Sequence, residues 1–289
     1  MTVASDTTWT IAAVLKWATE DFRARGIENP RLDVEVLLSR ALGASRTQLV
    51  IEMMKPLAPD ELARFREMVK RRRAREPVAY ILGEREFYGR TFRVDSRVLI
   101  PRPDTETLVE VALARTRRVS MSARVLDLCT GSGCVAITLA RERPTTSVVG
   151  ADASEGAVAV AEENALRLGA YNARFVACDL YGDLPSDFDL ITANPPYIPS
   201  DEVPRLSPDI EKFEPKLALD GGADGLAIAK RILEGAPEHL AAGGVLAMEV
   251  GAGQAERVAE AMRARGFAEV ERARDYARIE RVVSGVWTR

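Results

Sequence analysis

The first 75 residues show the apolar spacing of amphipathic helices. In the first stretch the apolar positions follow one another at helical intervals, at Ile11, Val14, Leu15, Ala18 and Phe22. This spacing puts them on one face of a helix that ends near Gly26. Asn29 before Pro30 predicts the start of a second helix, which Gly43 ends, and a third is expected from near Pro59. The segment is predicted to form a small helical bundle.

The pattern changes between residues 77 and 103. Aromatic and β-branched residues occur there together with turn formers, as in FYGRTFRV at 87–94 and VLI at 98–100. Such a composition is typical of short strands joined by a tight turn. We expect a β-hairpin over 77–103 that links the helical segment, residues 1–76, to the remainder of the chain.

From about residue 104 onward, strand-like and helix-like stretches alternate. The candidate strands are 124–128, 147–152, 174–177, 190–193 and 245–250, and the candidate helices are 133–142, 154–168 and 224–240. This alternation predicts an α/β domain over 104–289, built on a parallel sheet with crossover helices.

Composition narrows the classes of protein that need to be considered. With 289 residues, of which 47% are apolar, the chain can bury two cores without disulfides or a structural metal. The formal net charge of −3 leaves no general basic surface, so stable nucleic-acid binding is not expected. No apolar run reaches the roughly 18 residues of a membrane span, so no membrane contact is expected either.

The cysteines bear on location and on metals. Cys129, Cys134 and Cys178 are odd in number, and the start of the chain has no secretion signal, so we expect a cytoplasmic protein. Their spacing does not match a zinc motif, and no metal is expected.

The first candidate site is the glycine-rich turn VLDLCTGSG at 125–133. Small residues from Thr130 to Gly133 allow the backbone to turn sharply after a strand and to approach a ligand closely. Asp152 lies 19 residues beyond Gly133, where a carboxylate can accept hydrogen bonds from ribose hydroxyls. Both NAD and S-adenosylmethionine carry such a ribose. Asp127, four residues before Gly131, can orient the loop or meet a cationic amino group, which favours S-adenosylmethionine.

The second candidate site is the run ITANPPYIP at 191–199, which follows a predicted strand. The two prolines stiffen this corner and remove two backbone donors, so that carbonyl groups point outward. The side-chain oxygen of Asn194 and the carbonyl of Pro195 can each accept a hydrogen bond from one planar NH2 group, and Tyr197 offers a ring face. The run is predicted to bind a conjugated amine or amide.

A conjugated NH2 group is a poor nucleophile because its lone pair is delocalised. Two directed hydrogen bonds that hold the nitrogen in line with an electrophilic methyl group favour a pyramidal nitrogen and supply proximity. The methylated nitrogen is then acidic enough to lose its proton to solvent or to Asn194 without a dedicated base. The corner therefore predicts an amino- or amide-directed methyl transfer.

Several segments of the chain resemble the HemK/PrmC family, the release-factor glutamine N5-methyltransferases. The segments that carry the resemblance are PVAYILGEREFYGRTFRVDSRVLIPRPDTETLVE at 77–110, VLDLCTGSGCVAITLARERP at 125–144, ANPPYI at 193–198, FEPKLALDGGADGL at 213–226 and RDYARIERVVSGVW at 274–287. The resemblance implies a class I, Rossmann-like S-adenosylmethionine-dependent methyltransferase domain, with a helical amino-terminal bundle that helps to dock the substrate. It implies methyl transfer to the glutamine of the Gly-Gly-Gln motif in class-one peptide-chain release factors, which affects translation termination.

The resemblance also assigns residues by position. It implies that Asn194 and Pro195 are catalytic and that the acceptor amide is bound by Asn194, Pro195, Pro196 and Tyr197. The cofactor residues that it implies are Asp127, Cys129, Thr130, Gly131, Ser132, Gly133, Asp152, Asp179, Leu180 and Asn194. The chain departs from the family at Cys129, where glycine is usual, and at Leu180, where some relatives have tryptophan.

Three other functions remain open at this stage. A related family methylates a glutamine of a ribosomal protein and shares the NPPY run, although IPRPDTE at 100–106 favours the release-factor branch. DNA and RNA amino-methyltransferases act on conjugated amines as well, but they usually carry basic surface for the strand. The third possibility is an adaptor that binds S-adenosylmethionine or a release factor without catalysing a reaction, but such a protein would not need an intact Asn194 corner.

The basic cluster KRRRAR at 70–75 is expected to be a solvated helix end.

Overall fold

The computed structural model describes residues 9–116 and 122–288, which form two compact units. The first unit runs to Gly83 and the second begins at Glu84. The division therefore lies seven residues beyond the boundary at 76 that the sequence suggested. The reason is a short helix, Val78–Leu82, whose Ile81 is buried in the core of the first unit.

The first unit is a helical bundle. Its helices are α1 (Ile11–Ala24), α2 (Pro30–Leu42), α3 (Arg46–Ile51), α4 (Pro59–Arg73) and α5 (Val78–Leu82). The apolar face expected on α1 is buried, and Gly43 ends α2 in the left-handed conformation (φ 63°). Asn29 precedes Pro30 at the start of α2 as expected, but its side chain makes no capping hydrogen bond. Sequence reasoning missed α3 and α5 because each spans fewer than two turns.

The expected β-hairpin is present but shorter than the segment 77–103. It consists of β1 (Glu84–Phe87) and β2 (Arg90–Arg93), which pair antiparallel around Tyr88 and Gly89. Phe87 and Phe92 are buried with their ring centroids 6.0 Å apart. The hairpin is part of the second unit, because the Arg93 amide donates to the buried Asn164 side chain at 2.7 Å.

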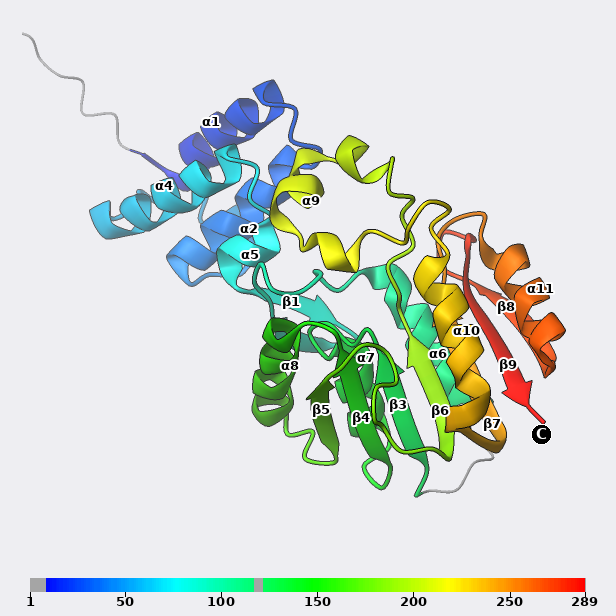
Figure 1. Ribbon diagram of the computed structural model, residues 1–289. Coiled ribbons are helices and arrows are strands. Elements are labelled where there is room, and N and C mark those ends of the chain that lie inside the picture. The colour runs from blue at the N-terminus through cyan, green and yellow to red at the C-terminus, as the bar shows by residue number, and fades with distance from the viewer. Residues whose placement is uncertain (1–8, 117–121, 289) are drawn as a thin grey trace, which may run out of the picture. The chain divides into compact units, whose positions relative to one another are not determined.

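A seven-stranded sheet forms the centre of the second unit, in the order β5-β4-β3-β6-β7-β9-β8 (Figure 1). The strands are β3 (Arg124–Leu128), β4 (Ser147–Asp152), β5 (Ala173–Ala177), β6 (Phe188–Ala193), β7 (Leu240–Glu249), β8 (Phe267–Arg274) and β9 (Glu280–Trp287). The first five in sheet order are parallel, but β9 pairs antiparallel with β7 and with β8. The predicted parallel sheet is present over five strands, and β9 and β8 add an antiparallel edge that was not predicted, since no crossover helix lies between β8 and β9.

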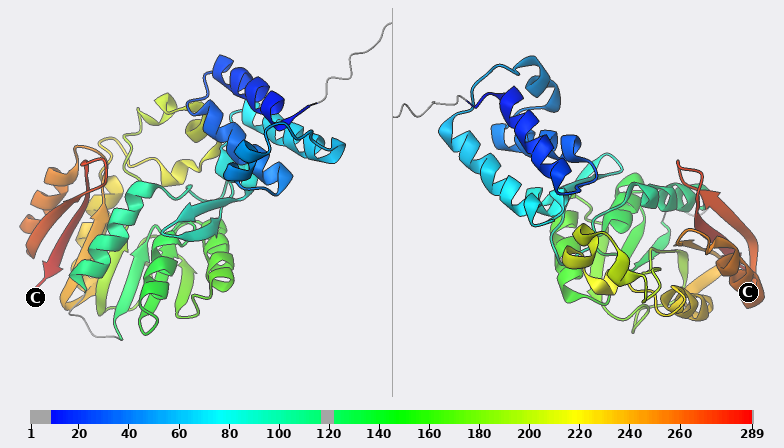
Figure 2. Two further views of the ribbon diagram at one scale, coloured as in Figure 1. Left: turned by 180° about the vertical axis from the view of Figure 1, so that it is seen from behind. Right: turned by 90° about the horizontal axis from the view of Figure 1, so that it is seen from above.

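Helices cover both faces of this sheet (Figure 2). One face packs against α6 (Glu106–Arg115), α7 (Cys134–Glu142) and α8 (Glu155–Leu168), and the other against α10 (Ala227–His239) and α11 (Ala255–Arg265). Short turns η1 (Pro103–Thr105), η2 (Val203–Arg205) and η3 (Lys216–Ala218), with helix α9 (Pro208–Phe213), lie in the connections. The fold is the class I methyltransferase architecture that the resemblance implied.

The strand order reverses between β3 and β6, which puts a crevice at their carboxyl ends. In open α/β sheets, ligands bind at such a switch point. Among the described residues, no helix has both the length and the apolar character needed to cross a bilayer.

Candidate functional site

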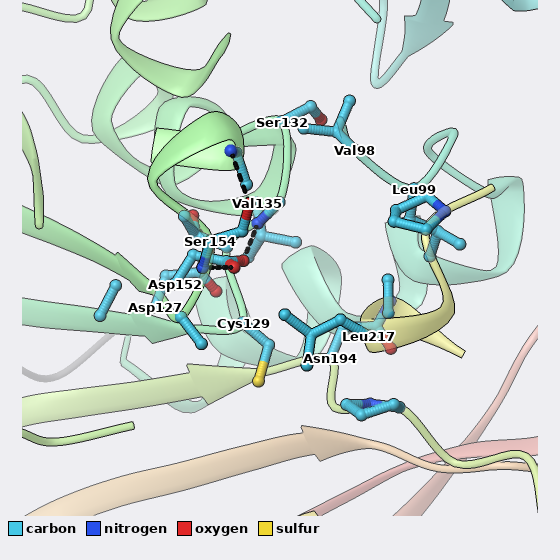
Figure 3. Close-up of a pocket in the computed structure, with 18 of the residues that line it drawn as sticks. Val98, Leu99, Asp127, Cys129, Ser132, Val135, Asp152, Ser154, Asn194 and Leu217 are labelled. Atoms are coloured by element: carbon cyan, nitrogen blue, oxygen red, sulfur yellow. Dashed lines mark hydrogen bonds between the residues drawn. The ribbon is translucent and has the colours of Figure 1, made fainter. Parts of the chain in front are cut away.

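A cavity of about 510 Å³ opens at the carboxyl ends of β3, β4 and β6. It brings together ten residues of the two predicted sites, which are Asp127, Cys129, Thr130, Gly131, Ser132, Asp152, Asp179, Leu180, Asn194 and Pro196. Figure 3 shows the glycine turn and Asp152 on one side of the cavity and Asn194 on another. The glycine turn and the Asn-Pro-Pro corner therefore share one hollow.

Three predicted residues do not line this cavity. Gly133 begins α7 with φ 78°, and a Cβ there would lie 2.9 Å from Ile137 and 3.1 Å from Ala161. Its role in the structure is close packing of the helix, not contact with the hollow. Pro195 is buried, and Tyr197 is turned toward the ends of β7 and β9.

Asp152 holds the glycine turn from the neighbouring strand. Its carboxylate accepts hydrogen bonds from the backbone N–H of Gly131 at 2.9 Å and of Ser154 at 2.9 Å (Figure 3). Burial raises the pKa of Asp152, and the two backbone donors oppose that rise. Each oxygen retains a free lone pair, so the carboxylate can accept further hydrogen bonds from a ligand in the cavity.

Asp127 is the buried anchor of the same turn. One of its oxygens accepts from the hydroxyl of Thr130 at 2.6 Å and the other from that of Thr192 on β6 at 2.7 Å. Burial raises the pKa of Asp127 to about 6, against the effect of these donors and of the Ala136 backbone. Asp127 thus ties the turn, the start of α7 and the adjacent strand together.

The buried hydroxyl of Ser132 also lines the cavity and has no hydrogen-bond partner within the described chain. A buried polar atom without a partner is costly, and a ligand with polar groups would satisfy it. Asp152 and Ser132 thus offer an acceptor and a hydroxyl in a hollow of ligand size, which fits a nucleoside with ribose hydroxyls and a polar tail.

The Asn-Pro-Pro corner follows β6. The Asn194 side-chain NH2 donates to the Thr105 hydroxyl at 3.2 Å, and the amide oxygen of Asn194 has no hydrogen-bond partner among the residues that the structure describes. The backbone oxygen of Tyr197 accepts from the Gln254 side chain at 2.9 Å. A Cβ on Gly225 (φ 70°) would lie 2.3 Å from that same oxygen, so glycine is required there. The corner is therefore fixed by hydrogen bonds at its first residue, Asn194, and at its last, Tyr197.

A buried carboxylate lies beside this corner. Glu249, the last residue of β7, is 1% exposed, and the Thr105 hydroxyl lies close enough to lower its pKa. Burial raises its pKa to about 7. Burial likewise raises the pKa of the Tyr197 phenol to about 12, and the charge of Glu249 contributes to that rise.

Sequence reasoning missed a large part of the cavity wall. The segment before α6, the loop after β6 and the start of α10 contribute Arg97, Val98, Leu99, Pro101, Arg102, Thr105, Pro215, Leu217, Ala218, Asp220, Ile228 and Arg231. Two of the segments that carry the family resemblance, 77–110 and 213–226, contain most of these residues. That resemblance was the available signal, because neither segment has a motif with a chemistry of its own.

The two departures from the family pattern have a common backbone feature. Cys129 (φ 56°) and Leu180 (φ 53°) both adopt the left-handed conformation that favours glycine. Tyr181, next to Leu180, is buried, donates its hydroxyl to the Ile232 backbone oxygen at 2.8 Å and stacks on His239 at 4.2 Å. It therefore supports α10 and is not part of the cavity wall.

Comparisons with known proteins agree with this architecture. A family described as "PrmC N-terminal domain" matches residues 13–83, and one described as "Methyltransferase small domain" matches 104–205. A solved methyltransferase from Pyrococcus furiosus has a TM-score of 0.52 at 16% identity, covering 70% of this chain and 91% of its own, which shows the fold alone.

The sequence relatives are more specific. A "Release factor glutamine methyltransferase" of Geobacter sulfurreducens is 47% identical over 96% of both chains. The chain belongs to the release factor glutamine methyltransferase family. A second member, from Cereibacter sphaeroides, is 42% identical over 94% of this chain and 97% of its own. The family membership accounts for both units, because these relatives extend over nearly the whole sequence.

Proposed function

We propose that this protein transfers a methyl group from S-adenosylmethionine to the side-chain amide nitrogen of the glutamine in the Gly-Gly-Gln motif of class-one release factors. The observation that carries the proposal is the position of Asn194. Its uncommitted amide oxygen follows β6 at the wall of the same cavity that the glycine turn and Asp152 line. The acceptor-binding group and the cofactor-binding groups are thus in one hollow.

The proposed cofactor residues fit S-adenosylmethionine by their chemistry. Asp152 accepts hydrogen bonds from the ribose hydroxyls, and Asp179, which also lines the cavity, accepts from the amino group of the base. The turn from Cys129 to Ser132, including the Ser132 hydroxyl, holds the amino-acid end, Gly133 allows the helix behind the turn to pack closely, and Asp127 keeps the turn in place. S-adenosylmethionine supplies, when bound, an electrophilic methyl group on a sulfonium.

The proposed acceptor residues orient the glutamine amide. Asn194 lines the cavity and accepts one hydrogen of the amide NH2 through its side-chain oxygen. Pro195 is buried and does not line the cavity, but its carbonyl directly follows Asn194 in the chain and is assigned the second hydrogen. Pro196 keeps the corner rigid and Tyr197 packs against it, so little conformational freedom is lost on binding. Two directed hydrogen bonds favour a pyramidal amide nitrogen and hold it in place. Solvent then takes the proton that the methylated nitrogen releases.

Charge distribution disfavours the nucleic-acid alternative. In the basic cluster at 70–75, three guanidinium groups form ion pairs with acidic residues of the first unit. These pairs are Arg71 with Glu76, Arg72 with Asp33 and Arg73 with Asp21. Cations paired within the protein release few counterions from a phosphate backbone, so this cluster is not a strand-binding surface. The ribosomal-protein alternative uses the same chemistry and has to be separated by experiment.

The test is incubation with methyl-labelled S-adenosylmethionine and a purified class-one release factor. A matched reaction contains the same release factor with the motif glutamine changed to alanine. We expect label in the intact release factor only, with mass spectrometry placing the methyl group on the glutamine.

Two further reactions contain ribosomal proteins or single-stranded nucleic acid as acceptors. Label in either of these without label in the release factor would overturn the proposed substrate. Label in the alanine variant of the release factor would overturn the proposed acceptor atom.

A further inference from the structure

The buried carboxylate of Glu249 has no evident role in stabilising the fold. Its oxygen Oε2 has no hydrogen-bond partner within the described chain, and burial is the largest cause that raises the pKa of the carboxyl group to about 7. The nearby guanidinium groups are committed elsewhere, Arg102 to Glu214 at 2.6 Å and Arg281 to Asp104 at 3.2 Å. A buried charge without an ion pair costs stability, so its presence calls for a functional explanation.

The fold places Glu249 next to the acceptor corner. Strands β6 and β7 are neighbours in the sheet (Figure 1). They run parallel, and Ala193 pairs with Met248. Asn194 directly follows the last residue of β6 and Glu249 is the last residue of β7, so they lie side by side at the carboxyl edge of the sheet. Thr105, 2% exposed, lies at the end of η1, accepts a hydrogen bond from Asn194 and is close enough to Glu249 to lower its pKa.

The hydrogen bonds of these three residues have a defined direction. An ionised carboxylate can only accept, so when the nearby Thr105 hydroxyl bonds to Glu249 it must give its single hydrogen. The Thr105 oxygen can then only accept, and it does so from the NH2 group of Asn194 at 3.2 Å. The other end of the Asn194 amide, its carbonyl oxygen, is thereby left free.

Protonation of Glu249 means that the donor and acceptor roles in these hydrogen bonds are no longer fixed. A protonated carboxyl can donate to the Thr105 oxygen, and the Thr105 hydrogen is then free to turn toward Asn194. The amide of Asn194 can rotate by 180° and present its NH2 group where its oxygen was. Two NH2 groups that face one another cannot form a hydrogen bond, so a glutamine amide would lose one of its two acceptors.

We propose that Glu249 and Thr105 are positioning residues that fix the orientation of the Asn194 amide, with its oxygen available to the acceptor glutamine. The proposal rests on the function proposed above. Neither residue touches the reacting atoms. Each acts through Asn194 alone.

A pH dependence follows from the positioning role. The charged and titratable groups that act on Glu249 from the neighbouring elements are Arg281 on β9, Arg102 and Asp104 before α6, Tyr197 after β6 and Cys134 on α7. The arginines favour the ionised form and Asp104 opposes it. Because the ionised form is the orienting one, kcat should rise as pH increases through the neutral range and then level off.

The test compares three variants with the wild type at saturating release factor. Glu249→Gln and Thr105→Val remove the directed hydrogen bonds at nearly constant volume. We expect each to lower kcat by about tenfold to a hundredfold, with the dissociation constant for S-adenosylmethionine changed by less than about threefold. Glu249→Gln should also lack the rise of kcat through neutral pH, whereas Thr105→Ser, which keeps the hydroxyl, should regain most of the kcat lost in Thr105→Val.

A matched control removes a buried hydroxyl elsewhere. Thr138 on α7 is 0% exposed, and its hydroxyl has no partner within the described chain, so Thr138→Val makes the same chemical change away from the corner. It should retain the wild-type kcat and the wild-type pH profile. Loss of the pH dependence in this control as well would overturn the assignment to Glu249.

A spectroscopic readout separates this proposal from the proposed function. In the protein without substrate, the side-chain NH2 signals of Asn194, identified by their loss in Asn194→Asp, should shift with pH near neutrality in the wild type but not in Glu249→Gln. A pH-independent signal in the wild type, or wild-type kcat in Glu249→Gln, would overturn the positioning role. A wild type that methylates no release factor but shows the shift would instead overturn the proposed function.

Discussion

The two halves of the cavity differ in how far their polar groups are hydrogen-bonded within the protein. On the side of β3 and β4, both oxygens of Asp127 and both oxygens of Asp152 accept hydrogen bonds from the protein itself. On the side of β6 and β7, the Asn194 amide oxygen accepts no hydrogen bond from the described residues. Glu249, next to Asn194 in the sheet register but not in the cavity lining, has one oxygen without a partner among the same residues. The carboxylates of the first half are thus preorganised by hydrogen bonds within the protein, and its Ser132 hydroxyl remains available to a ligand, whereas Asn194 in the second half keeps an acceptor for another molecule.

The largest expected effect of this division is on turnover. Asn194→Ala should lower kcat by about a hundredfold or more, because it removes an acceptor that binds the reacting amide. The dissociation constant for S-adenosylmethionine, measured by calorimetry, should change by less than about threefold. Asn29→Ala is the matched control, since Asn29 is exposed and makes no side-chain cap bond. Unchanged turnover in Asn194→Ala would contradict the division between the two halves.

The next effect is on cofactor affinity and belongs to the other half. Asp152→Ala should weaken S-adenosylmethionine binding by about 1.5 to 3 kcal/mol, the value of a hydrogen bond to a charged group. Asp183→Ala removes the same charge at an exposed position and should leave the affinity unchanged. Equal affinities of the Asp152 variant and the wild type in a calorimetric titration would count against the ribose assignment.

A third prediction concerns stability and the buried carboxylate of the second half. The pKa of Glu249 is raised from 4.5 to about 7 in the folded protein, so the folded state holds its proton more tightly than the unfolded state does. The stability of the wild type should therefore fall as pH rises from about 4.5 through about 7.

Glu249→Gln removes the titratable group, so comparing the variant with the wild type measures the contribution of Glu249 to the pH dependence of stability. Between pH 5 and pH 8, the variant should gain about 2 kcal/mol in free energy of unfolding relative to the wild type. Urea unfolding at the two pH values measures the difference, to which Asp127 contributes equally in both proteins. A constant difference between the two proteins would mean that Glu249 does not titrate in this range.

The smallest effect is expected at Cys129 in the glycine turn. Cys129→Gly removes the strain of a non-glycine residue in the left-handed conformation, which stabilises the folded state by about 1 kcal/mol. Glycine also increases the conformational entropy of the unfolded chain, which opposes this gain. The free energy of unfolding should therefore change by less than about 1 kcal/mol. Cys134→Gly makes the same exchange at a buried position in α7, and it should lower the free energy of unfolding by at least about 1 kcal/mol. Denaturant midpoints would show this contrast. Equal losses in both variants would show that the backbone at Cys129 is not strained.

Strands β3 and β4 were predicted with their observed bounds, because buried parallel strands are nearly continuous apolar runs. Strands β8 and β9 and helices α6 and α11 were not predicted. The direction of β9 depends on its pairing with β7, and no local pattern encodes a strand's direction. The hairpin was expected as a linker, yet contact with Asn164 makes it part of the second unit.

The sequence by itself determined which groups stand at the ends of the strands. Asn194 and Asp152 each end or follow an apolar run, and the carboxyl ends of parallel strands converge at one edge, so a shared site could be predicted. Only the tertiary structure decided what surrounds Asn194. Thr105 lies 89 positions away in sequence, and Glu249 reaches the corner through the register of β6 and β7. Register and burial arise from packing between distant segments, and these made an ordinary threonine and an ordinary glutamate neighbours of the reacting corner.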